Sequence, residues 1–282
     1  MNSAETLAIT YGLGSGFAWG AGDFSGGLAA RETGVFSVIL YSQVIGGLLL
    51  LGIHLALGGG TPGGVYLLWG GLAGACGALG LAALYRGLAV GRMGMVAPVS
   101  AVVTAVGPVI FAFFTEGMPR TTQLAGFAGA VFSVWLFSST RTRGGITATE
   151  LGLATVSGVC FSLFFIFIDR ASSQAVLAPL VAARAASIAL MAAILAARRE
   201  LAPPARGPLP RVALAGVMDA VGNTFFALAS RSGRLDVAVI LVSAVYPVAT
   251  VVLARFILLE RLRPRQRFGL LTTAVSLALI AA

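Results

Sequence analysis

The chain contains ten apolar runs, each close to the roughly 20 residues that an α-helix needs to cross the hydrocarbon core of a bilayer. The longest gap, 198–210, is a Pro-rich loop that could not hold a soluble domain. Only 10% of the residues are charged, against roughly 25% in a soluble domain. We therefore predict an all-α integral membrane protein with ten transmembrane helices. The runs cover residues 7–29, 35–57, 65–84, 95–114, 121–140, 150–168, 176–197, 211–230, 236–258 and 264–282.

The second half of the sequence repeats the first. The tetrapeptide Val99–Val102 recurs as Val242–Val245 at an offset of 143 positions, which is close to half of the 282-residue chain. We therefore predict two five-helix repeats, 1–145 and 146–282. Because five is an odd number, the second repeat must enter the membrane from the opposite face. Such inverted repeats are common among secondary transporters.

The basic residues are distributed unevenly between the two sides of the predicted bundle. The net charge is +9, and every basic residue except the single His is Arg. Thirteen of the 19 Arg residues lie in gaps that follow odd-numbered runs, and four lie in the other gaps. The positive-inside rule places the Arg-rich gaps in the cytoplasm and both termini outside. Because these residues flank apolar runs, their expected partners are anionic lipid headgroups and not nucleic acid.

Motifs for enzymatic chemistry are missing from the sequence. It contains no GxxxxGK[ST] loop for ATP, no Gly-x-Ser-x-Gly motif and no cluster of His and Asp residues. Cys76 and Cys160 lie inside apolar runs without neighbours at metal-ligand spacing, so we read them as small buried hydrophobes. We expect no enzymatic activity, no cofactor and no metal.

The ends of both halves carry a pattern of short motifs: a Pro in the fourth run, a Glu at its end, and a Gln and a Gly that open the fifth. The first half departs from the second, because eight residues separate its Pro from its Glu, against thirteen in the second half. The residues are Pro108, Glu116, Gln123 and Gly126 in the first half, and Pro247, Glu260, Gln266 and Gly269 in the second.

This pattern resembles the EamA-type permeases of the drug/metabolite transporter superfamily. The resemblance implies a transporter with a central cavity between two halves. It also implies cytoplasmic termini, which is the opposite of the orientation that the Arg count favours.

The leading hypothesis is a secondary transporter of the inner (plasma) membrane that works by alternating access. It would move small metabolites, amino acids or amphipathic compounds, in the direction of export. The expected partners are a small-molecule substrate, the lipid bilayer, a proton or another coupling ion, and a second copy in a homodimer. The alternative is a membrane receptor or complex subunit that binds a ligand without transporting it.

Polar and aromatic residues deep inside the runs are the candidate binding residues, since a charge at the bilayer centre costs at least ~2.5–3.5 kcal/mol. Arg184 could hold an anionic group, and Asp219 or Asp23 could bind a cation or carry the coupling proton. In the alternative reading, Arg184 and Asp219 only pair with each other. The full candidate set is Trp19, Asp23, Tyr41, Gln43, Ser100, Arg184, Asp219, Asn223, Ser243 and Tyr246.

Two Pro residues inside apolar runs occupy corresponding helices of the two halves. Pro108 and Pro247 each remove a backbone hydrogen bond and favour a bend. We predict that they act as hinges, with a static kink as the alternative.

Overall fold

The structure is a computed structural model. It describes residues 3–91, 93–116, 146–201, 206–232, 235–259 and 264–281, with residues 121, 122, 124–126, 128, 129 and 132. Every element in these ranges is an α-helix, so the predicted all-α class is confirmed for the described chain. The helices are α1 (Ser3–Glu32), α2 (Val35–Ala56), α3 (Gly64–Val90), α4 (Met93–Glu116), α6 (Ala148–Ser172), α7 (Leu177–Ala197), α8 (Leu209–Ser232), α9 (Leu235–Ile257) and α10 (Pro264–Ala281).

Within the described residues, five helices are long and apolar enough to cross a membrane by length and composition: α2, α3, α6, α7 and α8. Several helices continue past the predicted apolar run into charged residues. For example, α3 extends through Arg86 to Val90, because its backbone hydrogen bonds continue where the chain leaves the hydrocarbon layer. The predicted run 121–140 lies mostly outside the described residues, so the count of ten helices stays a prediction.

Local sequence signals fix where several helices begin and end. The N-terminus of α6 is a capping box, in which Thr147 Oγ1 accepts a hydrogen bond from the Glu150 backbone N–H at 3.2 Å. The Glu150 carboxylate in turn accepts one from the Thr147 N–H at 2.7 Å. The turn after α2 passes through Gly58 at φ 60°, a backbone conformation that Gly adopts without steric cost.

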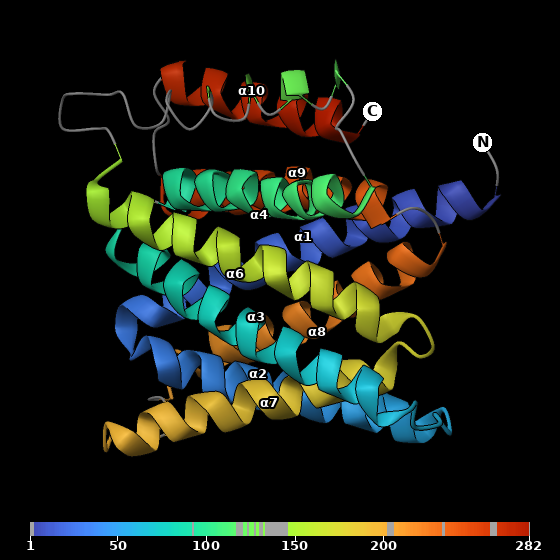
Figure 1. The fold of residues 1–282 in the computed structure, drawn as a ribbon. Helices are drawn as coiled ribbons and strands as arrows, with labels where there is room; N and C mark the ends of the chain where they lie inside the picture. Colours follow the sequence, from blue (N-terminus) through green and yellow to red (C-terminus); the bar gives the residue numbers. More distant parts are fainter. Residues whose placement is uncertain are drawn as a thin grey trace.

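The helices run side by side, and α4 with α9 and α2 with α7 each pair a helix of the first half with one of the second half. In Figure 1, α10 lies at one edge, α4 and α9 lie next to it, and α2 and α7 form the opposite edge. The start of α1 and the end of α10 lie on the same side of the bundle (Figure 1). A chain that crosses the bundle an even number of times has both ends on the same side.

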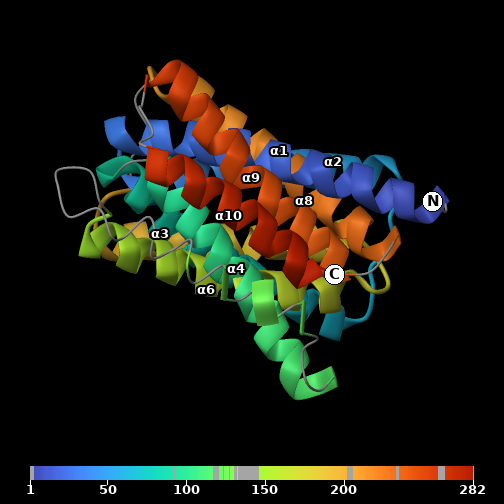
Figure 2. The ribbon, with the colours of Figure 1, turned by 90° about the horizontal axis from the view of Figure 1, so that it is seen from above.

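Most helix packing joins the two halves of the sequence. Helix α1 packs on α8 and α9, and α6 packs correspondingly on α3 and α4; likewise α2 packs on α8, and α7 on α3. We call α1, α2, α8 and α9 the first bundle, and α3, α4, α6 and α7 the second bundle. Figure 2 shows the first bundle on one side and α3, α4 and α6 of the second on the other. Each bundle therefore contains two helices from each half.

Glycines allow two equivalent helix pairs to approach closely. A side chain at Gly74 of α3 would collide with the carbonyl oxygen of Ala183 in α7, and one at Gly216 of α8 would collide with that of Ser42 in α2. The two glycines are 142 positions apart and the two carbonyls 141 apart, which matches the offset of the sequence repeat. Small residues permit this backbone contact in lipid, where apolar burial alone gives little drive to pack.

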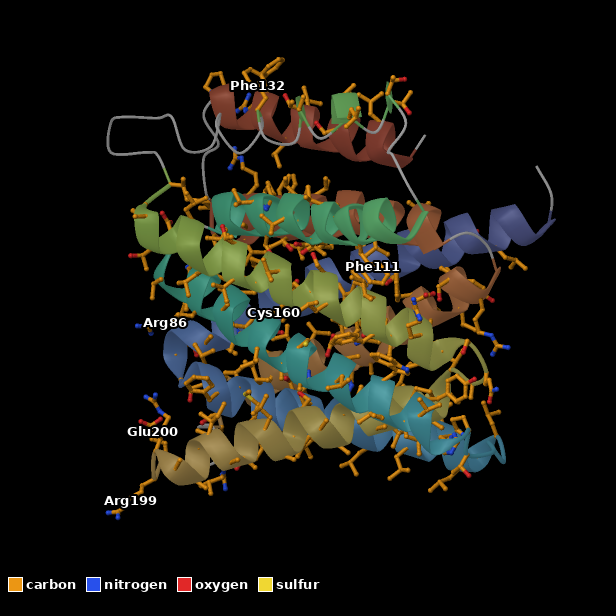
Figure 3. The ribbon with its side chains drawn as sticks, in the orientation of Figure 1. Arg86, Phe111, Phe132, Cys160, Arg199 and Glu200 are labelled. Carbon is orange, nitrogen blue, oxygen red and sulfur yellow. The ribbon has the colours of Figure 1, made fainter. Side chains whose placement is uncertain are left out.

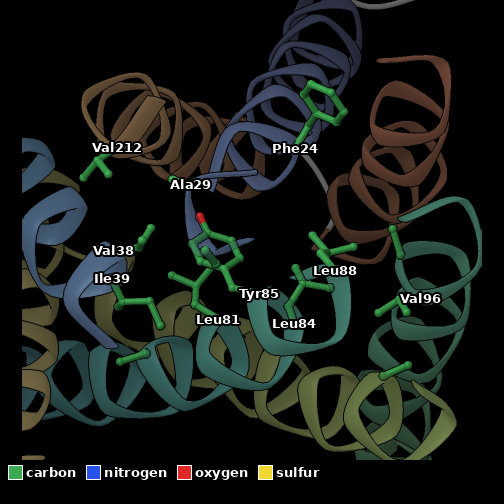
Figure 4. Packing of buried hydrophobic residues seen from close by; sticks show 14 of the residues in the cluster. Phe24, Ala29, Val38, Ile39, Leu81, Leu84, Tyr85, Leu88, Val96 and Val212 are labelled. Atoms are coloured by element: carbon green, nitrogen blue, oxygen red, sulfur yellow. The ribbon is translucent and has the colours of Figure 1, made fainter. Parts of the chain in front are cut away.

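The largest hydrophobic cluster is centred on α3. Leu84, Tyr85 and Leu88 are fully buried there, and they contact α1 and α2 through residues that include Phe24 and Ile39 (Figure 4). This packing holds the cavity-lining stretches of the three helices at fixed depth.

Candidate functional site

A cavity lies between the two bundles and is lined by residues of eight helices, α1 to α4 and α6 to α9. Its empty volume is about 660 Å³, including the part that opens outward. Seven of the ten predicted binding residues line it. They are Trp19, Asp23, Gln43, Arg184, Asp219, Asn223 and Tyr246.

The Asp219 carboxylate is the centre of a hydrogen-bond network in this cavity. Its Oδ2 accepts from Arg184 Nη1 at 2.5 Å and from Gln43 Nε2 at 2.9 Å. Its Oδ1 accepts from Trp19 Nε1 at 3.1 Å and from Asn223 Nδ2 at 3.0 Å. Arg184 Nη1 also donates to Gln43 Oε1. Four donors and one full positive charge therefore compensate the carboxylate, as buried charges require.

Arg184 connects the two bundles across the cavity. It belongs to α7 in the second bundle, whereas Asp219 and Gln43 belong to α8 and α2 in the first. The Arg184 and Asp219 side chains are only 9% and 14% exposed. Arg184 and Gln43 are 141 positions apart, so these two residues occupy corresponding places in the two halves and meet each other. Arg184 and Asp219 form an ion pair and also line the cavity, and their roles in binding stay a prediction.

Asp23 differs from Asp219 because it has no such compensation. It lies on α1 one turn after Trp19, lines the same cavity and is only 7% exposed. Within the described part of the chain, no side chain or backbone N–H donates a hydrogen bond to it, and no cation pairs with it. Asp23 is therefore a buried carboxylate that faces the cavity without a partner.

Three further buried polar atoms of cavity residues lack a hydrogen-bond partner among the described residues. They are Nη2 of Arg184, Oγ of Ser187 and Oδ1 of Asn223. Buried polar groups without partners are uncommon, and each one calls for an explanation such as a water or a ligand. Of these three groups, Arg184 Nη2 can donate, Asn223 Oδ1 can accept, and the Ser187 hydroxyl can do both.

The wall of the cavity on the second bundle is aromatic. Phe161, Phe164 and Phe165 of α6 line it. The Trp19 ring lies 6.2 Å from Phe164 and 5.6 Å from Phe165, measured between ring centroids. These rings give the cavity an apolar face opposite its carboxylates.

The other predicted residues lie elsewhere. Tyr41 packs against the hydrophobic cluster, and Ser100 is fully buried, where its Oγ donates to Ser157 Oγ at 3.1 Å; neither lines the cavity. The side chains of Ser243, Pro108 and Pro247 lie outside the described residues. Helices α4 and α9 continue through positions 108 and 247, and the hinge role stays a prediction.

The sequence analysis did not single out Thr104, Ser187 or the three Phe residues of α6, which also line the cavity. A signal for the aromatic wall was present. The segment FSLFFIF, residues 161–167, places four Phe residues in two turns of the predicted sixth helix.

Comparison with known proteins assigns the class of the chain. Residues 149–282 match the EamA-like transporter family. Together with its apolar helices, this match makes the chain a multi-pass membrane protein. The second half is an EamA-type sequence of the drug/metabolite transporter superfamily, as its motifs predicted. This family comprises transporters and not enzymes, consistent with the expected absence of enzymatic activity.

The fold also occurs in solved structures. Seventeen solved chains match, and one of them is a crystal structure with a TM-score of 0.64 and 18% sequence identity. The alignment covers 96% of this chain and 95% of that chain. At this level of identity the likeness concerns the fold alone. No curated protein sequence matches the chain.

Proposed function

We propose that this chain is a secondary transporter of the inner membrane that exports a small amphipathic metabolite by alternating access. Its substrate would occupy the central cavity between the two bundles. The observation that carries the proposal is the contact of Arg184 with Asp219 and Gln43, because it is a buried polar tie between the bundles at the cavity itself. Charged groups at this depth are costly and mark functional sites in membrane proteins.

We further propose ten helices in two inverted repeats, residues 1–145 and 146–282. The packing supports this, because exchanging each helix for the one five places along converts the α1 contacts with α8 and α9 into the α6 contacts with α3 and α4. The matching contacts at Gly74 and Gly216 support it as well. In inverted-repeat transporters the substrate site lies near the midplane at the repeat interface.

In this mechanism the two bundles rock about the substrate. In the structure Arg184 of the second bundle bonds to Gln43 and Asp219 of the first bundle. Moving the two bundles apart at the cavity would require at least one of these two contacts to break. Substrate binding would offset that loss. Trp19, Gln43, Asn223 and Tyr246 would contact the substrate, and the proton or coupling ion would use one of the two carboxylates. Pro108 and Pro247 would permit bending, and a homodimer remains the proposed assembly.

We orient the Arg-rich end of the bundle toward the cytoplasm. Arg86 and Arg199 lie at one end in Figure 3, opposite the start of α1. The positive-inside rule then places both termini outside.

Metabolite profiling of medium and cytosol tests the function directly. Cells would express wild type, Asp219→Asn, or Asp169→Asn as a control whose carboxylate lies on α6 away from the cavity lining. We expect one class of compound to accumulate in the medium with wild type and Asp169→Asn and not with Asp219→Asn.

Net flux of the identified compound into proteoliposomes would then separate a transporter from a receptor or subunit. Saturable binding without flux would refute transport and favour the receptor. Equal export by wild type and Asp219→Asn would remove this carboxylate from the mechanism.

A further inference from the structure

We propose that Asp23 is the binding site for a protonated amine, so that the transported compound is an amphipathic molecule with one net positive charge. This inference rests on the proposed function, because it names the substrate class of the same cavity.

The charge balance of the cavity leads to this assignment. Its described lining has two carboxylates, Asp23 and Asp219, and one guanidinium, Arg184, so one negative charge is left over when both carboxylates are ionised. Arg184 lies in direct contact with Asp219, whose two oxygens are already occupied by four donors. The uncompensated charge is therefore on Asp23. An isolated ionised carboxylate at this depth is costly, and either a bound proton or an occupant with one positive charge removes that cost.

Other groups that line the cavity with Asp23 suit an ammonium group. Asn223 Oδ1 is buried and without a partner, and it can accept an N–H bond. Trp19 stands one turn from Asp23 on α1 and lines the same cavity, so its ring can contribute to binding a cation. A carboxylate, an amide acceptor and an indole of the first bundle thus line the same cavity.

The opposite wall determines the remainder of the ligand. Four polar or indole residues of the first bundle correspond, at an offset of 142 positions, to apolar residues or Gly of the second bundle, and all eight line the cavity. At these four positions the repeat is therefore symmetric in fold and asymmetric in chemistry, whereas Thr104, Arg184 and Ser187 are polar residues that the second bundle contributes elsewhere in the lining. The pairs are Trp19 with Phe161, Asp23 with Phe165, Asp219 with Gly77, and Asn223 with Leu81.

A zwitterion is the nearest competing ligand, because the free Nη2 of Arg184 could donate to a substrate carboxylate. Such a ligand carries no net charge, so the cavity would keep one negative charge when both carboxylates are ionised. It would also compete with Asp219 for the same guanidinium. The unpartnered Nη2 is better suited to a neutral acceptor, such as a hydroxyl or carbonyl oxygen of the cationic ligand.

A series of ligands with one aromatic ring and different head groups tests the assignment. The probes are 2-phenylethylamine (cation), phenylalanine (zwitterion), 3-phenylpropionate (anion) and 2-phenylethanol (neutral), each added to the purified full chain in lipid nanodiscs at neutral pH. A ligand that binds only the folded state raises the unfolding temperature, so this temperature reports affinity. We expect the amine to bind roughly tenfold more tightly than the other three.

Two variants locate the effect. Asp23→Asn should abolish the preference for the amine, and Asp169→Asn, outside the cavity lining, should keep it. Equal shifts with all four compounds, no shift with any, tighter binding of phenylalanine, or an undiminished preference in Asp23→Asn would each overturn the inference. The comparison among ligands uses wild type, so it does not depend on the folding of a variant.

The same set of experiments separates this inference from the proposed function. If profiling shows export of an anionic or neutral compound, the amine site is wrong and the transporter proposal stands. If the amine binds as expected and no compound crosses the membrane, the site is right and transport is wrong.

Discussion

The buried pair of Arg184 and Asp219 gives the most informative stability prediction. With charges about 4 Å apart and an effective dielectric constant of about 20, their attraction is about 4 kcal/mol. Removing one partner of a buried pair costs about 3–5 kcal/mol, because the other charge is left without compensation. We expect Arg184→Gln to be the more costly exchange, since it leaves the carboxylates of both Asp219 and Asp23 in the cavity. Asp219→Asn leaves Arg184 with Asp23 and should cost less.

The double variant Arg184→Gln/Asp219→Asn measures the interaction energy between the two charges apart from the effect of each single exchange. It removes both charges, so it should destabilise less than either single variant, with a coupling energy of about 3 kcal/mol. The assay is reversible unfolding in mixed micelles, followed by tryptophan fluorescence. The matched control is the Glu32–Arg211 pair, whose side chains are 49% and 44% exposed and whose coupling should be only about 0–1 kcal/mol. Additive costs for the buried pair, or equal coupling in both pairs, would refute the reasoning.

Two further exchanges test the packing and the network. Gly216→Ala should destabilise the protein by about 1–3 kcal/mol in the same unfolding assay, since its methyl group meets the Ser42 carbonyl. The control Gly52→Ala, in an open part of α2, should be neutral or stabilising by up to about 1 kcal/mol. Equal effects of the two exchanges would contradict the close approach of α8 to α2. Trp19→Phe removes one donor to Asp219 and should cost only about 0.6 kcal/mol for that hydrogen bond; a loss above about 2 kcal/mol would show that the indole does more than donate it.

The sequence predicted the class of the fold because hydrophobicity acts locally. A run of apolar residues about as long as the bilayer is thick becomes a helix wherever it lies in the chain, since every backbone group must be paired within the membrane. The all-helical, multi-pass character and the EamA-type identity of the second half are confirmed. The number of ten helices stays a prediction, since the fifth run lies mostly outside the described residues.

The sequence also indicated how deep each polar residue lies in the membrane. It did not indicate which way the side chain faces around the helix axis. Gln43 is the ninth residue of the predicted run 35–57 and Arg184 the ninth residue of the run 176–197, and the two side chains meet. Tyr41 lies only two residues from Gln43, yet it packs against the hydrophobic cluster and does not line the cavity. The apolar runs here are hydrophobic on all sides, so no amphipathic pattern marks the face that turns inward.

The sequence by itself determined that this protein is a repeated set of membrane helices with a few costly polar residues at mid-depth, because those properties depend on each run alone. Only the tertiary structure decided which of the polar residues are paired with an opposite charge. Asp219 and Asp23 are both single carboxylates within apolar runs, and nothing local distinguishes them. Packing of α7 against α2 brings Arg184 to Asp219 and leaves Asp23 without a partner among the residues that the structure describes. Compensation of a charge depends on neighbours from other helices, which only the assembled bundle brings together.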